Sequence, residues 1–144
     1  MSERPSSGRR KTRRRISRSA EFERVYRKGR SKANQYLVLY AFKRSNEDDE
    51  SARLGLSVSR RVGGAVERSK VKRLLREAFW EEAQGLPSEC DYVVVARPDV
   101  RTLAERDGLT GIQKALTELV IAIGGKPKDG KAVEQEPDRD EELR

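Results

Sequence analysis

The chain has 144 residues, 39% charged and 35% hydrophobic, with a formal net charge of +8 and a sequence pI near 9.9. We therefore expect one domain with tails and a polyanionic partner, nucleic acid before an anionic membrane. The lack of histidine removes the usual general base near neutral pH, and with the single Cys90 it excludes a conventional zinc site and an internal disulfide. No nucleotide-binding glycine motif, signal peptide or membrane-spanning apolar run is present, so the composition favours a cytoplasmic binding protein.

Both ends of the chain are highly charged. Residues 1–16 together with Arg18 include eight Lys or Arg against the single acid Glu3, which is typical of a disordered basic arm that closes onto phosphates or of a solubilising tail. Residues 126–144 carry a net charge of −2 without apolar periodicity, so we expect a disordered tail, and +10 remains on residues 1–125. The folded domain is therefore expected over residues 17–125.

A first helix is predicted from Ser19, a suitable N-cap residue, to Gly29, a suitable C-cap residue. Phe22, Val25 and Tyr26 follow at i, i+3 and i+4, so they share one face of this helix.

Two strands are predicted next. The segment YLVLYAF (36–42) is rich in aromatic and branched residues, and RLGLSVS (53–59) alternates strictly between apolar and small side chains. The acidic segment between them, 45–51, has the composition of a solvated turn.

A basic helix is predicted over 66–83 and ends before Gly85 and Pro87. Its apolar residues recur at helical spacing and should pack on a sheet: Val71, Leu74, Leu75, Ala78 and Phe79.

The last two elements are a strand and a helix. CDYVVVARP (90–98) has apolar side chains on both faces, which indicates a central strand. Thr110 and Gln113 form a capping-box pattern that starts a final helix, which ends at 124–125. The predicted class is α+β, in the order αββαβα, with the first strand either continuous or divided in two.

The densest cationic cluster lies at the start of the basic helix. Residues 59–79 contain seven Lys or Arg: Arg60, Arg61, Arg68, Lys70, Lys72, Arg73 and Arg76. Cations at a helix N-terminus are disfavoured by about 0.3–1 kcal/mol each, and an ordinary solvated face would mix both signs in i, i+4 pairs. We therefore expect phosphates at this helix start, bound by these side chains and by backbone amides near Gly63 and Gly64.

Small residues on the strand at 53–59 suggest a second binding feature. Gly55, Ser57 and Ser59 leave a shallow floor, beside which Tyr40 would join Phe22 and Tyr26 in an aromatic cleft. Such a cleft suits unstacked single-stranded RNA, although an apolar stripe at this spacing is equally consistent with plain core.

Two stretches resemble the bacterial ribonuclease P protein subunit family, over roughly Arg15 to Pro98. EFERVYRKGRSKANQYLVLY resembles the family's opening helix and first strand, and RLGLSVSRRVGGAVERSKVKRLLREAF resembles its signature, G-N-A-V-x-R-N-R-hydrophobic-K-R-x-x-R. The chain departs from that signature at Gly64, where Asn is usual, and at Ser69 and Lys70, where Asn and Arg are usual.

The resemblance implies a two-layer α/β sandwich with a left-handed βαβ crossover, an exception to the usual handedness. It also implies that a catalytic RNA subunit, which binds most of the Mg²⁺, removes the 5′ leader of precursor tRNA. The protein then has no catalytic or metal-ligating residue, no obligate protein partner and no membrane partner. The implied RNA-binding residues are Arg60, Arg61, Arg68, Ser69, Lys70, Lys72, Arg73 and Arg76. The implied leader-cleft residues are Phe22, Tyr26, Tyr40 and Ser57.

Two other functions stay open at this point. A ribosomal-type RNA-binding protein would share the basic surface without requiring an aromatic cleft. A protein-only, metal-dependent nuclease would use carboxylates such as Asp48, Asp49 and Glu50, but these acids lie in a turn without a preorganised partner set. Trp80 falls on the polar stripe of the basic helix and either stacks on RNA or covers a neighbouring segment.

Overall fold

A computed structural model of the chain describes residues 14–44 and 51–124. Its strands are β1 (Arg14–Arg15), β2 (Arg30–Ala33), β3 (Leu37–Lys43), β4 (Arg53–Ser57) and β5 (Cys90–Ala96). Its helices are α2 (Ser19–Lys28), α3 (Ala65–Glu82) and α4 (Val100–Ala122), and the 3₁₀ turn η1 (Ala83–Gly85) follows α3. The mixed α+β class is confirmed.

The strands form one sheet in the order β1-β4-β5-β3-β2. β5 lies at its centre, parallel to β4 and antiparallel to β3, which confirms the central strand predicted from apolar residues on both faces. α3 joins the parallel neighbours β4 and β5, so this is the βαβ unit for which the family resemblance implies a left-handed crossover.

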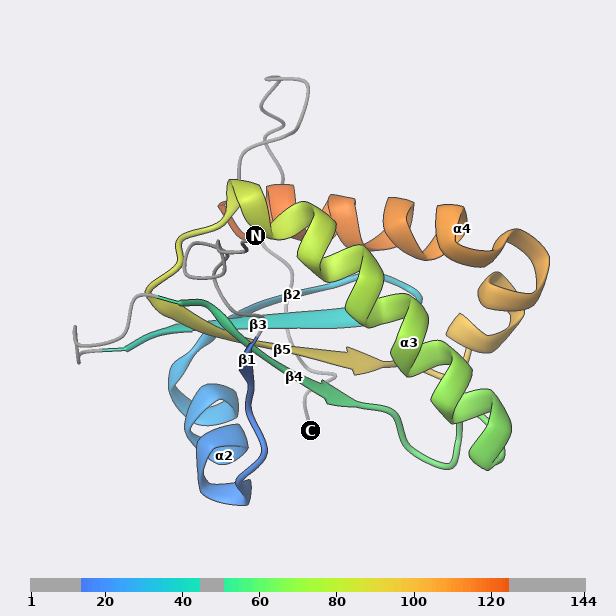
Figure 1. Ribbon diagram of the computed structural model, residues 1–144, viewed down its shortest axis with the longest axis horizontal. Helices are drawn as coiled ribbons and strands as arrows, with labels where there is room; N and C mark the ends of the chain where they lie inside the picture. The colour runs from blue at the N-terminus through green and yellow to red at the C-terminus, as the bar shows by residue number, and fades with distance from the viewer. Residues whose placement is uncertain (1–13, 45–50, 125–144) are drawn as a thin grey trace, which may run out of the picture.

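Helices cover both faces of the sheet (Figure 1). α3 and α4 pack together on one face over the larger core, in which Leu75, Phe79, Tyr92 and Leu116 are almost fully buried. The expected two-layer sandwich is this sheet with its pair of helices. α2 lies on the other face and closes a smaller core around Val25.

The basic helix forms within one residue of its predicted bounds, and its apolar face packs as expected. Val71, Leu75, Ala78 and Phe79 are buried, and Leu74 is partly buried against the same core. The opposite face is therefore free to carry polar and charged side chains.

The sheet begins earlier than the sequence suggested. Residues 14–16 were assigned to the disordered arm, but Arg14–Arg15 pair in parallel with β4, and Ile16 is only 5% exposed. The burial of Ile16 in the smaller core explains this difference. β2 is a further strand, paired antiparallel with a continuous β3.

Two helix starts also differ from prediction. Ser19 is the first residue of α2, and Arg18 occupies the N-cap position without a side-chain hydrogen bond. α4 begins at Val100 and continues past a kink at Gly108, where φ is 58°. Thr110 and Gln113 do not form the expected capping box, because both lie inside α4; the Gln113 amide instead donates to Glu82 and to the Ala78 carbonyl of α3.

None of the helices within the described ranges is long and apolar enough to cross a membrane. The acidic turn at 45–51 falls almost wholly outside the described residues, as do the basic arm up to residue 13 and the C-terminal tail.

Candidate nucleic-acid interface

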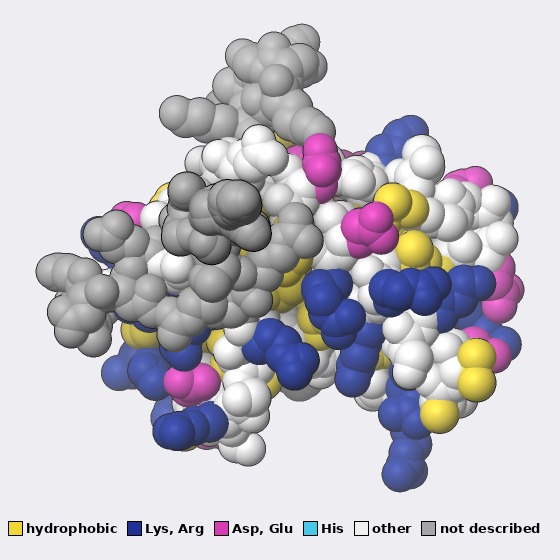
Figure 2. Space-filling view, viewed as in Figure 1, with side chains coloured by type: hydrophobic (Ala, Val, Ile, Leu, Met, Phe, Trp, Pro, Cys, Tyr) yellow, Lys and Arg dark blue, Asp and Glu magenta, His cyan; other side chains and the backbone are white. Residues whose placement is uncertain are grey.

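The cations of α3 and of the loop before it form one surface, which we call the basic face. Its members are Arg60, Arg61, Arg68, Ser69, Lys70, Lys72, Arg73 and Arg76. All are exposed except Arg68, which is half-buried. Lys and Arg side chains gather across the middle of the molecule, over α3 (Figure 2). The structure therefore brings together all the residues that the sequence predicted for RNA.

The charges of the basic face are not neutralised by neighbouring acids. Among the described residues, none of its cations lies within ion-pairing distance of a carboxylate, although Glu67 and Glu77 belong to the same helix. An exposed cation without a partner retains its full attraction for a phosphate.

The loop that precedes α3 is held by one apolar anchor. Val62 is 2% exposed, and its backbone N–H donates to the Ser59 carbonyl. Burying this residue leaves Arg60 and Arg61, the two central residues of the turn, exposed.

The start of α3 corrects one expectation about phosphate binding. The Gly64 N–H donates to Glu67 Oε1 at 3.1 Å. This backbone amide, which we expected to donate to a phosphate, is therefore already hydrogen-bonded to a carboxylate of the same helix. Glu67 also suits the helix dipole, which partly offsets the cations around it. Arg68 donates from Nε to the Gly63 carbonyl at 3.2 Å, which leaves its other nitrogens for a ligand.

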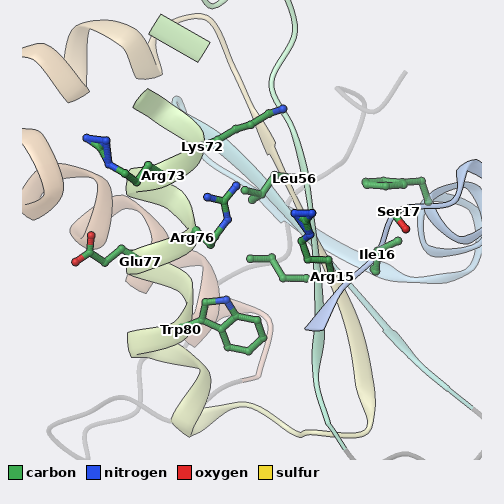
Figure 3. Close-up of a pocket in the computed structure, with 11 residues that line it drawn as sticks. Arg15, Ile16, Ser17, Leu56, Lys72, Arg73, Arg76, Glu77 and Trp80 are labelled. Atoms are coloured by element: carbon green, nitrogen blue, oxygen red, sulfur yellow. The ribbon is translucent and has the colours of Figure 1, made fainter. Parts of the chain in front are cut away.

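A groove of about 700 Å³ runs between α3 and the edge of the sheet at β1 and β4. Lys72, Arg73 and Arg76 line it from α3, and Arg15 lines it from β1. Arg15 and Arg76 lie on facing walls with Leu56 between them (Figure 3). Arg15 is a cation of this site that the sequence placed only in a general basic arm.

The four residues predicted for the leader cleft lie together on the α2 face of the sheet and form what we call the aromatic cluster. The ring centroids of Tyr26 and Tyr40 are 4.9 Å apart, and those of Phe22 and Tyr26 are 6.2 Å apart. The hydroxyls of Tyr26 and Ser57 share a hydrogen bond. Partial burial raises the pKa of Tyr26, and the bond to Ser57 opposes that shift only in part.

Tyr40 is more buried than an aromatic residue lining an open cleft would be. It is only 5% exposed, because it lies in the smaller core under α2, whereas Tyr26 is 37% exposed. Tyr26 is therefore the aromatic residue best placed to meet a base. Tyr40 supports Tyr26 from below through an edge contact.

A network of charged residues, which the sequence did not indicate, fixes α2 to the sheet. Arg53 of β4 donates twice to Asp91 of β5, at 2.8 Å each, and once to Glu21 of α2 at 3.0 Å. Arg44 donates to Asp91 Oδ1, the oxygen that also accepts from Arg53 Nε, again at 2.8 Å. Burial alone would raise the pKa of Asp91, but hydrogen bonds from Arg53 and Arg44 outweigh it and hold the pKa below its usual value.

No group of three or more metal-ligating side chains lies together within residues 14–44 and 51–124. The acids considered for a nuclease, Asp48, Asp49 and Glu50, lie outside these ranges.

Comparison with known proteins agrees with these features. A sequence model of the family described as Ribonuclease P matches residues 11–120. The ribonuclease P protein component of Shouchella clausii is 43% identical over 118 residues, which cover 80% of this chain and 95% of the relative. That of Bacillus pumilus is 41% identical over 103 residues, covering 72% and 85%.

Solved structures show the same relationship. The structure of the Staphylococcus aureus RNase P protein matches with a TM-score of 0.65 at 34% identity, covering 76% of this chain and 94% of that one. The Thermotoga maritima RNase P protein gives a TM-score of 0.63 at 29% identity, covering 74% and 94%. The chain therefore belongs to the ribonuclease P protein family, the protein subunit of the endoribonuclease that matures the 5′ end of tRNA.

Proposed function

We propose that the basic face binds the RNA subunit of ribonuclease P and that the aromatic cluster binds the 5′ leader of precursor tRNA. The observation that carries the first part is the set of exposed cations without acid partners among the described residues. Each phosphate that they neutralise releases counterions, which supplies affinity independent of sequence.

The leader assignment is supported by the chemistry of the aromatic cluster. Phe22 and Tyr26 offer ring surface near the small residues Gly55 and Ser57 of β4. Aromatic platforms of this kind suit bases that are already unstacked, as in a single-stranded leader. Mature tRNA has no 5′ leader, so this contact would favour the precursor.

The division of labour in this proposal gives the chemistry to the RNA subunit with Mg²⁺. The described residues offer no clustered carboxylates for that ion and no histidine for proton transfer. In this proposal the protein contributes positive charge and positions the substrate RNA. The proposal also includes a cytoplasmic location and no obligate protein partner.

Reconstitution tests the proposal directly. The full chain is mixed with a ribonuclease P RNA at low Mg²⁺, and cleavage of precursor tRNA is followed. We expect the protein to stimulate cleavage and to raise affinity for precursor over mature tRNA. Absence of stimulation would refute the proposal.

Two outcomes would point to the other functions. Equal affinity for precursor and mature tRNA in the presence of the RNA subunit would favour a ribosomal-type RNA-binding role. Cleavage by rigorously RNA-free protein would favour a protein-only nuclease.

A further inference from the structure

Trp80 faces the groove between α3 and the sheet edge, one helical turn beyond Arg76. The indole is half-buried: it packs against the larger core and meets the Phe79 ring edge to face, with centroids 5.0 Å apart and planes at 81°. Figure 3 shows the indole turned toward the space between α3 and β1, below the guanidinium groups of Arg76 and Arg15. Its orientation is therefore fixed by packing, and part of the ring remains accessible.

The groove combines two kinds of surface. Ile16, Leu54 and Leu56 give it apolar lining on the sheet side, next to the indole. The cations of its lining come from both walls, Arg15 from β1 and three from α3, against the single acid Glu77. Glu77 points away from the space between the two arginines (Figure 3). An aromatic ring beside apolar lining, with cations above, matches a base joined to its phosphates.

We propose that this groove takes one unpaired nucleotide of bound RNA, its base stacked on Trp80 and its flanking phosphates held by Arg15 and Arg76. This inference rests on the proposed function, because it names a contact made by the same RNA-binding surface. It adds a stacking site at Trp80, on the α3 wall of a groove whose lining also includes Phe22 of the aromatic cluster.

Charge and chemistry favour this occupant over an acidic peptide. A peptide carboxylate would satisfy the cations but would leave the indole and the apolar lining without a planar partner. Stacking of a base on an aromatic side chain contributes about 1–3 kcal/mol by alanine substitution, which corresponds to roughly a five- to hundredfold change in affinity. Cations within reach of the same base add the phosphate contacts that a nucleotide requires.

Trp80 is the single tryptophan of the chain, so its fluorescence reports on this groove alone. The full-length protein is titrated with short oligoadenylate, with an abasic oligomer of equal length, and with polyglutamate. We expect oligoadenylate to quench Trp80 emission strongly, because the base covers the ring, and the abasic oligomer to bind with little quenching. Equal quenching by all three polyanions, or none by oligoadenylate, would overturn the proposal.

Variants give a second readout that does not depend on fluorescence. Trp80→Leu keeps apolar bulk against Phe79 and should weaken oligoadenylate binding about tenfold, with Trp80→Phe falling between. Neither should change the salt slope of binding, since no phosphate contact is lost. Arg76→Ala should lower that slope by about 0.7, the value for one contact on a single strand. A Trp80→Leu protein that melts like the parent yet binds oligoadenylate as tightly would refute the stacking contact.

The outcome can be separated from that of the proposed function. If the protein stimulates cleavage with the RNA subunit while Trp80 emission is insensitive to bases, only the nucleotide groove is wrong. If it neither binds the RNA subunit nor stimulates cleavage, the proposed function fails first.

Discussion

Single cations on α3 differ from cations elsewhere in this protein in whether a carboxylate already pairs with them. Arg73 and Arg76 both line the groove, are exposed and have no carboxylate partner among the described residues. By contrast, Arg106 on α4 is exposed but pairs with Asp107 at 3.2 Å. Arginine side chains on α3 are therefore available to bind a polyanion, whereas Arg106 on α4 is already paired with an acid.

Replacing Arg73 or Arg76 with Ala should weaken binding to the RNA subunit and flatten its salt dependence. Each lost phosphate contact should reduce the slope of log K against log salt by about 0.7–0.9. Filter binding over a salt series measures this slope. Arg106→Ala removes the same charge outside the basic face and serves as the control; a slope unchanged in both α3 variants would place the interface elsewhere.

Tyr26 should carry more of the leader contact than Tyr40, since it is the exposed member of the pair. We expect Tyr26→Ala to reduce the precursor-over-mature affinity ratio about tenfold with little loss of stability. Tyr40→Ala should instead lower the free energy of unfolding by about 3 kcal/mol, because it empties a buried site. Competition binding and urea unfolding distinguish the two, and a stable Tyr40→Ala protein would contradict the burial argument.

The sequence predicts the position of some site residues but not of others. Within the basic face, the stripe of Ser69, Arg73 and Arg76 followed from spacing, because i, i+3 and i+4 positions share a side of a helix. The other members came from the density of charge and from the family resemblance. The burial of Tyr40 did not follow from spacing, because it depends on how closely α2 approaches β3 and β5. The capping role of Glu67 could have been predicted from the sequence. Glu67 is the third residue of α3, a position at which a carboxylate commonly caps the start of a helix.

At the scale of elements, the attachment of α2 to the sheet controls the shape of the aromatic cluster. Its polar link is the chain Glu21–Arg53–Asp91–Arg44, in which Asp91 is 1% exposed. Its apolar contact includes a close approach at Gly55, where an added Cβ would lie 2.7 Å from the Phe22 ring.

Asp91→Asn should destabilise the protein by about 3–5 kcal/mol at neutral pH, because Arg53 and Arg44 would lose their buried counter-charge. The folded pKa of Asp91 lies below the unfolded value of about 3.9, so its contribution is present above that pH and is lost as pH falls through the folded pKa. Urea unfolding from neutral to acid pH should therefore show a flatter profile for Asp91→Asn. Asp107→Asn, at an exposed pair, should behave like the parent.

Gly55→Ala should displace the Phe22 ring and disturb the aromatic cluster, with an overpacking cost of about 1–3 kcal/mol. We expect a lower precursor-over-mature ratio and a smaller change in affinity for the RNA subunit, since Phe22 also lines the groove but the cations that would bind phosphates belong to α3. Parallel binding assays with both RNAs test this. A parallel loss in both assays would mean that the change spreads through the sheet.

Helices and strands with a regular apolar period could be predicted from the sequence, and those without one could not. α3 and β5 were predictable because their apolar residues keep a regular period over many positions. β1 has two arginines and no pattern, and its pairing depends on the burial of Ile16 beside it. The first part of α4 was missed because Gly108 interrupts the period after Val100, Leu103 and Ala104, which are nonetheless buried.

For the whole molecule, the sheet divides the surface into two working sides. The basic face lies on the side of α3 and the aromatic cluster on the side of α2, and the groove lies between them, lined by Trp80 from α3 and by Phe22 from α2. An RNA that contacts both must pass the edge formed by β1 and β4, where Arg15 lies. One small domain can thereby touch two RNA segments at once.

The central place of β5 has a consequence for how the protein is made. β3 and β4 are not neighbours in the sheet, and each pairs with β5, the last strand in the chain. During synthesis, neither can complete its pairing until residues 90–96 have left the ribosome. α3 emerges before then, as a basic amphipathic segment without the sheet that will cover its apolar side. The cations of α3 are thus exposed before the domain has folded, while the nascent chain is still next to ribosomal RNA.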